Sequence, residues 1–174
     1  MPNAHSRIRL PSPAILKLIR LVATDVDGVL TDAGMYYTEA GDELKKFNTH
    51  DGMGIKLLQK AGLITAIVTQ ERTKLVARRA DKLTIPELHQ GVMDKLSCLR
   101  DMAQRYGLTL KEVAYIGDDV NDLEALRAAG FSAAPADALP PVLKAVRYVC
   151  RKKGGEGALR EIADLILAAQ GHGV

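Results

Sequence analysis

Two aspartates at the end of an apolar run are the first residues in the sequence whose types and spacing could do chemistry. Asp25 and Asp27 follow the run L-V-A-T at 21–24, which is apolar up to its last residue, and precede Gly28. A buried parallel strand reads as a near-continuous apolar run, and open α/β sheets bind ligands at the carboxyl ends of such strands. Two neighbouring carboxylates repel unless a cation or a proton lies between them. The pattern therefore predicts a cation or proton site, with a turn and a helix cap as the alternative.

Polar residues occupy corresponding places further along the chain. Thr69 ends a second long apolar run, Lys95 opens a predicted helix, and Asp118 and Asp122 follow another apolar run. Taken singly, each is typical of a helix cap or a solvated side chain. Because they occur in series at strand ends and helix starts, we expect them to meet Asp25 in one site.

Phosphoryl transfer is the chemistry that these residue types suit. A phosphoryl group in transfer carries charge on its oxygens and needs a cation and hydrogen-bond donors around it. Mg²⁺ takes carboxylate oxygens, which Asp25 and Asp118 can supply, while a lysine ammonium and a threonine hydroxyl suit the phosphate oxygens. One aspartate can attack phosphorus, and another can protonate the departing alkoxide and then deprotonate water.

Strands and helices alternate along the sequence, which indicates an α/β fold with a Rossmann-like, doubly wound parallel sheet. The 174 residues suit one domain over 21–174, preceded by an N-terminal arm over 1–20. Strand-forming residues at 34–38 and 43–47 predict a β-hairpin flap after the first strand. The later predicted strands are 63–69, 85–89, 113–116, 131–134 and 148–150, and the predicted helices are 51–61, 72–83, 94–106, 120–129, 138–145 and 156–169.

Composition argues against several classes of protein. The net charge is only +3, from 24 basic and 21 acidic residues, so we expect no nucleic-acid partner. Cys98 and Cys150 lie far apart with no C-x-x-C pair, which argues against a disulfide framework or a zinc site and suits a cytoplasmic protein. The apolar stretch 14–20 is short and is interrupted by Lys17 and Arg20, so we expect no membrane association.

The four signals together resemble the four motifs of haloacid dehalogenase superfamily phosphatases. They are D-V-D-G-V-L-T-D at 25–32, the strand-end Thr69, Lys95, and G-D-D-V-N-D at 117–122. The resemblance implies that Asp25 is the nucleophile and Asp27 the general acid and base of a Mg²⁺-dependent phosphatase that forms an aspartyl-phosphate. It also implies that Thr69 and Lys95 bind the phosphoryl group.

The same resemblance implies a ligand set for the metal. Mg²⁺ would be held by the carboxylate of Asp25, the main-chain carbonyl of Asp27 and the carboxylate of Asp118. Asp119 and Asp122 would lie in the shell around it, with Asp122 also supporting the lysine.

The span between Asp27 and Thr69 is short and holds only the predicted hairpin and one helix, so no cap domain is expected. The chain resembles the small capless members that cleave sugar-acid phosphates, the 3-deoxy-manno-octulosonate 8-phosphate and nonulosonate 9-phosphate phosphatases. The shared motifs are K-K-F-N at 45–48, D-G-M-G-I at 51–55, Q-G-V-M-D-K at 90–95 and G-G-E-G-A-L-R-E at 154–161. The resemblance implies a homotetramer in which a neighbour's hairpin helps to close each site. It also implies a phosphorylated sugar acid as substrate, Asn48 and Asn121 among its binding residues, and the loop 153–157 near it.

The sequence after the second long apolar run bears on the length of the sugar acid. Octulosonate enzymes generally show T-G-R here, whereas nonulosonate enzymes resemble T-G-E with a later R-R-A-x-K-L. This chain has T-Q-E at 69–71 and R-R-A-D-K-L at 78–83. Glu71 can accept hydrogen bonds from a substrate, and Arg79 or Lys82 can pair with its carboxylate, although a solvated helix face is the alternative for these basic residues. We therefore predict a nine-carbon substrate, 2-keto-3-deoxynononate or N-acylneuraminate 9-phosphate, and a place in sialic acid biosynthesis, with the octulosonate 8-phosphate as the alternative.

Two other classes share part of this pattern. A response-regulator receiver domain also places aspartates, a threonine and a lysine around Mg²⁺, but its lysine comes last, whereas Lys95 here precedes Asp118. A catalytically idle copy that serves as an oligomerisation or regulatory module has typically lost motif carboxylates, whereas Asp25, Asp27 and Asp118 are all present here. An active phosphatase is therefore the favoured interpretation.

Overall fold

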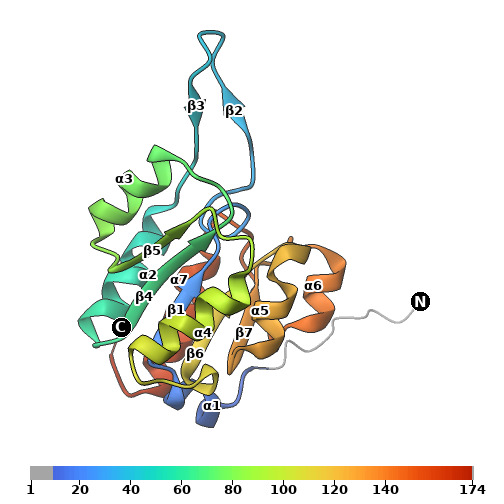
Figure 1. The fold of residues 1–174 in the computed structure, drawn as a ribbon. Helices are drawn as coiled ribbons and strands as arrows, with labels where there is room; N and C mark the ends of the chain where they lie inside the picture. The colour runs from blue at the N-terminus through green and yellow to red at the C-terminus, as the bar shows by residue number, and fades with distance from the viewer. Residues whose placement is uncertain (1–9, 174) are drawn as a thin grey trace.

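A parallel six-stranded sheet with helices on both faces forms the centre of the computed structural model, which describes residues 10–173 (Figure 1). The strand order is β5-β4-β1-β6-β7-β8, and every neighbouring pair is parallel. This confirms the predicted α/β class and the doubly wound sheet. The strands are β1 (Leu21–Thr24), β4 (Ile64–Thr69), β5 (Glu87–Gln90), β6 (Val113–Ile116), β7 (Phe131–Ala134) and β8 (Tyr148–Val149).

The central strand β1 pairs with β4 on one side and β6 on the other, so that Leu21 lies opposite both Ile64 and Val113. From β1 the chain builds β4 and β5 on one side and then returns to β6 on the other. This reversal makes the carboxyl ends of β1 and β6 the place where open α/β sheets form a ligand-binding crevice.

Alternation along β1 explains why both faces of the sheet are covered. Val22 belongs to one apolar cluster, whereas Leu21 and Ala23 belong to the other, because successive strand residues point to opposite faces. The first face carries α1 (Pro13–Leu18), α2 (Thr49–Lys60), α3 (Lys74–Leu83) and α7 (Ala158–Ala169), and the second carries α4 (Lys95–Arg105), α5 (Leu123–Ala128) and α6 (Pro140–Ala145). Short 3-10 turns occupy Leu110–Glu112 and Val120–Asp122. No helix within residues 10–173 is long and apolar enough to cross a membrane.

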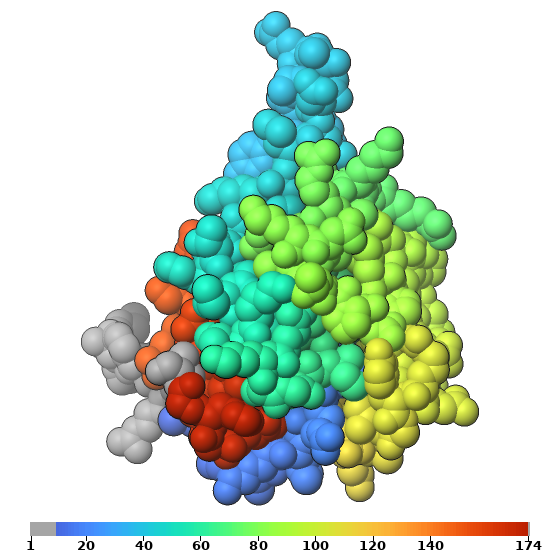
Figure 2. Space-filling model, turned by 90° about the vertical axis from the view of Figure 1, so that its left-hand side faces the viewer, coloured from blue at the N-terminus to red at the C-terminus, as the bar shows by residue number. Residues whose placement is uncertain are grey.

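A hairpin of β2 (Tyr36–Tyr37) and β3 (Glu43–Leu44) projects beyond the carboxyl ends of the sheet strands, where β1 ends (Figure 1). Figure 2 shows that it stands clear of the rest of the surface, and its large apolar side chains are exposed. An isolated bridge between Thr31 and Phe47 closes its base. Between β1 and β4 the described chain holds this hairpin and α2 and no cap domain, as expected.

Capping side chains move several helix boundaries away from their predicted places. The predicted helix at 51–61 begins at Thr49, because the Asn48 side chain accepts a hydrogen bond from the His50 N–H. The predicted helix at 72–83 begins at Lys74, since the Thr73 hydroxyl accepts from a backbone N–H in the first turn. Part of the predicted N-terminal arm packs on the domain: Leu16 and Ile19 are buried in its core, while residues 1–9 lie outside the described residues.

Candidate active site

The carboxyl ends of β1, β4 and β6 surround a cavity of about 400 Å³. Since these three strands are adjacent in the sheet, the polar residues that follow them are brought together although they lie far apart in the sequence. The cavity is lined by Asp25, Asp27, Ala33, Thr69, Gln70, Glu71, Asp118, Asp119 and Asn121. The sequence prediction that these strand ends form one site is therefore consistent with the structure.

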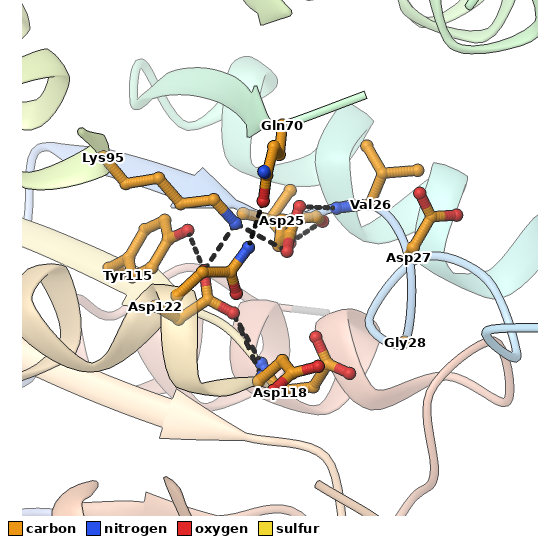
Figure 3. Close-up of polar contacts among 12 residues, drawn as sticks. Asp25, Val26, Asp27, Gly28, Gln70, Lys95, Tyr115, Asp118 and Asp122 are labelled. Carbon is orange, nitrogen blue, oxygen red and sulfur yellow. Dashed lines mark hydrogen bonds and ion pairs between the residues drawn. The ribbon is translucent and has the colours of Figure 1, made fainter. Parts of the chain in front are cut away.

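Lys95 joins two of the aspartates, Asp25 and Asp122 (Figure 3). Its Nζ lies 2.7 Å from Asp25 Oδ2 and 2.6 Å from Asp122 Oδ1, and the three side chains are 1%, 8% and 0% exposed. The other Asp25 oxygen accepts a hydrogen bond from the Val26 N–H at 2.7 Å. Lys95 is therefore a buried counter-ion that fixes the orientation of Asp25, and it is not a solvated first-turn lysine.

Tyr115 extends this buried network and was not identified from the sequence. Its hydroxyl donates to Asp122 Oδ1 at 2.6 Å, while Asp122 Oδ2 accepts from the backbone N–H groups of Asp118 and Asp119 at 3.0 and 3.2 Å. A Cβ on Gly117 would overlap the Asp122 carboxyl group. Tyr115 is the one hydroxyl-bearing residue in the otherwise aliphatic run of β6, and this was the signal in the sequence that could have revealed it.

Asp118 faces Asp25 and provides the clearest test of whether a cation fits. Oxygen atoms of Asp25, Asp118 and Asp122 lie within 4.8 Å of one another, and Asp118 Oδ1 is buried with no hydrogen-bond partner among residues 10–173. Burial, followed by the neighbouring charge of Asp25, raises the pKa of Asp118 to about 8. Burial and then the charge of Asp122 raise the pKa of Asp25 to about 6. A divalent cation relieves this kind of repulsion between buried carboxylates.

The hydrogen bonds of Asp122 decide which carboxylates are available as ligands. Its two oxygens together accept four hydrogen bonds, one oxygen from Lys95 and Tyr115 and the other from two backbone N–H groups, whereas each Asp25 oxygen accepts a single hydrogen bond and Asp118 Oδ1 accepts none among residues 10–173. Asp25 and Asp118 are thus the side chains that fit Mg²⁺, and Asp122 supports them from behind. A Cβ on Gly28 would overlap the Asp118 carboxylate, so this position of the turn after β1 needs glycine both for space and for its φ of 81°.

Asp27 belongs to a second ion-pair network on the open side of the cavity. Lys45, from the hairpin stem, places its Nζ 2.6 Å from Asp27 Oδ1 and 2.7 Å from Glu71 Oε2. The Thr31 hydroxyl donates to the same Asp27 oxygen at 3.3 Å. Although burial alone would lower the pKa of Lys45, the two carboxylates raise it above its ordinary value. In the sequence, Lys45 stood out only as part of a shared motif.

The residues predicted to bind substrate fall into two groups. Thr69, Lys95, Glu71 and Asn121 lie at the site, where Thr69, Glu71 and Asn121 line the cavity and Asn121 Nδ2 donates to Gln70 Oε1 at 3.1 Å. The other group, described next, lies outside the cavity lining.

Asn48, Arg79 and Lys82 do not line the cavity. Asn48 caps α2 and donates to the Gly155 carbonyl at 3.1 Å. Arg79 donates to the Asn48 carbonyl at 2.9 Å and lies over the Phe47 ring, 5.5 Å from its centroid. Lys82 is exposed on α3. The first two therefore join α2, α3 and the hairpin base in this structure.

The glycine-rich loop 153–157 packs behind the turn that carries Asp27. The Gly155 N–H donates to the Val29 carbonyl at 3.0 Å, and a Cβ on Gly154 would overlap the Gly28 carbonyl. The structure thus places this loop against the turn of the first motif, and the position near the substrate that the resemblance implied stays a prediction.

Comparisons with known proteins agree with this geometry. Residues 64–162 match a family model described as haloacid dehalogenase-like hydrolase. The chain is 45% identical over 152 residues to the 3-deoxy-D-manno-octulosonate 8-phosphate phosphatase KdsC of Yersinia pestis, covering 87% of this chain and 81% of that protein. It is 42% identical over 153 residues to the protein of the same name from Escherichia coli K12, covering 88% and 81%.

Solved structures give the same picture. A crystal structure of 3-deoxy-D-manno-octulosonate 8-phosphate phosphatase from Moraxella catarrhalis, in complex with magnesium, phosphate and a KDO molecule, superposes with a TM-score of 0.89 at 40% identity, covering 91% of each chain. The cobalt-bound enzyme of Haemophilus influenzae superposes with a TM-score of 0.86 at 41% identity, covering 90% of this chain and 92% of that one.

Proposed function

Because the chain belongs to the haloacid dehalogenase-like hydrolase family and is a Mg²⁺-dependent phosphoric monoester hydrolase, we propose that its substrate is 3-deoxy-D-manno-octulosonate 8-phosphate. The observation that carries the proposal is the agreement of the relatives: proteins that are 40–45% identical over most of this chain are named for this one substrate. The products would be the free sugar acid and inorganic phosphate.

Asp25 is the proposed nucleophile. Its carboxylate is held between Lys95 and the Val26 N–H, which fixes its direction toward the cavity. One oxygen would form a bond to phosphorus as the bond from phosphorus to the sugar oxygen breaks, giving an aspartyl-phosphate. Lys95 and Thr69 would donate to the phosphoryl oxygens. Mg²⁺, when bound by Asp25 and Asp118, supplies positive charge that stabilises the transferring group.

Asp27 is the proposed general acid and base. It lines the same cavity as Asp25, and its side chain is 31% exposed, so it is open to the leaving oxygen. It would give its proton to the departing alkoxide and then take a proton from the water that attacks the aspartyl-phosphate. The protein would thereby return to its starting protonation state after each turnover.

The comparisons favour the eight-carbon alternative over the nine-carbon substrate predicted from Glu71 and Lys82. Two observations support this change. Lys45 pairs with one oxygen of the Glu71 carboxylate at 2.7 Å, so part of its capacity to accept hydrogen bonds from a substrate is already used within the protein. Lys82 is exposed and lies outside the cavity lining. A nonulosonate 9-phosphate is therefore the second candidate.

Phosphate release from the two substrates is the direct test. We expect Mg²⁺-dependent release from octulosonate 8-phosphate with a kcat/KM well above that for nonulosonate 9-phosphate, and loss of release in EDTA. A higher kcat/KM for the nine-carbon substrate would keep the mechanism and overturn the substrate. No release from either would overturn the proposed function.

The hairpin is also the proposed interface of a homotetramer. Its exposed apolar side chains Met35, Tyr36, Tyr37 and Leu44 are 43–65% exposed in the single chain, and such a cluster on a projecting element favours contact with another subunit. Light scattering of the purified protein would test this assembly, with a monomeric mass contradicting it.

A further inference from the structure

We propose that Lys45 is a positioning residue for the general acid: it anchors the hairpin stem to the active site and orients the carboxyl group of Asp27. The inference rests on the proposed function and deepens it, because it assigns the hairpin a part in proton transfer within its own subunit.

Lys45 is buried and makes two specific ion pairs. Its side chain is only 2% exposed although the residue lies in the hairpin stem, and its Nζ bridges Asp27 at 2.6 Å and Glu71 at 2.7 Å. A lysine at a hairpin stem ordinarily extends into water, since burying the ammonium has a desolvation cost. Here that cost is offset by two carboxylates contributed by different segments of the chain.

Both hydrogen bonds to Asp27 are made to the same oxygen. Lys45 and the Thr31 hydroxyl each donate to Oδ1, and among residues 10–173 no side chain donates to Oδ2. Oδ1 is thus held in place, and Oδ2 is left to carry the proton to the leaving group. Lys45 would act on proton transfer through this orientation of Asp27.

The backbone of the hairpin stem also fixes the position of Lys45. It follows β3 directly, and two residues later Phe47 pairs with Thr31, the residue that also contacts Asp27. The hairpin stem and the turn after β1 are therefore joined at a backbone bridge and at the Lys45 ion pair. The position of Asp27 consequently depends on an element outside the main sheet.

Removing Lys45 would have two effects that can be separated. Asp27 and Glu71, with Glu43 nearby at 3.9 Å from Nζ, would be left as an uncompensated acidic group facing an anionic substrate, which weakens the binding of any phosphate ester. In addition, Asp27 would lose its orientation, which affects only reactions whose leaving group must be protonated. A sugar alkoxide needs that proton, whereas the nitrophenolate of p-nitrophenyl phosphate leaves without it.

The experiment compares kcat/KM for octulosonate 8-phosphate and p-nitrophenyl phosphate in wild-type protein, Lys45→Met and Lys45→Arg. This parameter covers the steps up to departure of the leaving group, so later hydrolysis of the aspartyl-phosphate does not enter it. We expect Lys45→Met to lose about 100-fold on the sugar substrate and at least about 10-fold less on the nitrophenyl ester. Lys45→Arg should recover most of the loss, because it keeps a cation at the same place.

Lys46→Met is the matched control, since the adjacent Lys46 side chain is 61% exposed and contacts Asp32 instead. It should leave both kcat/KM values unchanged. Equal losses on the two substrates in Lys45→Met, or no loss, would overturn the inference, and Lys45→Gln provides the same comparison if the methionine variant fails to fold. If the wild type releases no phosphate from octulosonate 8-phosphate, the proposed function fails instead, and the Lys45 comparison is made with nonulosonate 9-phosphate, which also has an alkoxide leaving group.

Discussion

Lys95 and Lys45 each bridge two carboxylates at nearly the same distances, yet they lie in different kinds of surroundings. Lys95 opens α4 and contacts Asp25 and Asp122, whose side chains are 8% and 0% exposed. Lys45 lies in the hairpin stem and contacts Asp27 and Glu71, whose side chains are 31% and 44% exposed. The first network is enclosed by the sheet and its helices, and the second borders solvent.

This difference separates fold stability from substrate chemistry. An ion pair with buried partners leaves an uncompensated buried charge when one member is removed, whereas solvated partners are screened by water. The enclosed network is thus tied to folding as well as to the nucleophile. The bordering network can change with little effect on folding, which suits the part of a site that meets the leaving group and the rest of the substrate.

Asp25→Asn should have the largest effect on activity, and it tests the enclosed network of Lys95. An amide is a poor nucleophile, so we expect turnover to fall by about 10⁴-fold or more. The thermal unfolding midpoint should not fall, because Lys95 keeps Asp122 as its partner and the repulsion between Asp25 and Asp118 is relieved. Circular dichroism melts and phosphate release would measure both.

The control for this variant is Asp101→Asn on the exposed face of α4, which should retain full activity. Turnover by Asp25→Asn within about 10-fold of wild type would contradict the assignment of the nucleophile.

Comparing the stability of Lys95→Met and Lys45→Met tests the two networks directly. Lys95→Met leaves the buried Asp25 and Asp122 carboxylates without their cation, and we expect the free energy of unfolding to fall by about 3–5 kcal/mol. Lys45→Met should lower it by about 1 kcal/mol or less, since Asp27 and Glu71 remain in contact with water. Urea unfolding in EDTA would measure both values, and equal losses would remove the distinction.

The Lys95 and Lys45 networks also differ in how far they could be predicted from the sequence. The strand ends that carry Asp25, Thr69 and Asp118 follow long apolar runs, and a parallel sheet brings such ends together regardless of the loops between them. The fold class, the series of site residues and the chemistry were accessible for this reason. Helix starts were less so, since Asn48 and Thr73 act as caps through side-chain contacts that a pattern of apolar positions does not contain.

The bordering network could not be predicted because it depends on long-range side-chain packing. Nothing in the local sequence of Lys45 indicates that a hairpin stem folds back onto Asp27 and Glu71. The structure pairs one oxygen of the Glu71 carboxylate with Lys45, a contact that the interpretation of Glu71 as a selector of nine-carbon substrates did not include. The guanidinium of Arg79 is a type of group that can bind a substrate carboxylate, but here it donates to the Asn48 carbonyl and lies over the Phe47 ring.

Tyr115→Phe should have a smaller effect on activity than Lys45→Met. It removes one hydrogen bond to the buried Asp122, which keeps Lys95 and two backbone donors. We expect the free energy of unfolding to fall by about 1.5–3 kcal/mol, as for a hydrogen bond to a charged group, and kcat to fall less than about 10-fold. Thermal melts and steady-state kinetics would measure the two quantities.

Tyr106→Phe is the matched control, because its hydroxyl donates to Glu87 at 2.8 Å and is not part of the cavity lining. It should leave kcat unchanged. An equal fall in kcat for the two tyrosine variants would mean that Tyr115 has no specific part in the site.

Lys82→Met should have the smallest effect, and it tests whether the substrate-binding surface extends along α3. Lys82 is exposed on α3 and lies outside the cavity lining, so its removal should change KM for octulosonate 8-phosphate by about 2-fold or less, as for an ordinary surface substitution. Lys74→Met, exposed on the same helix, is the control for the lost charge. A rise in KM that is large in Lys82→Met and absent in Lys74→Met would mean that Lys82 pairs with the substrate carboxylate. The substrate-binding surface would then extend beyond the cavity and Glu71, along α3.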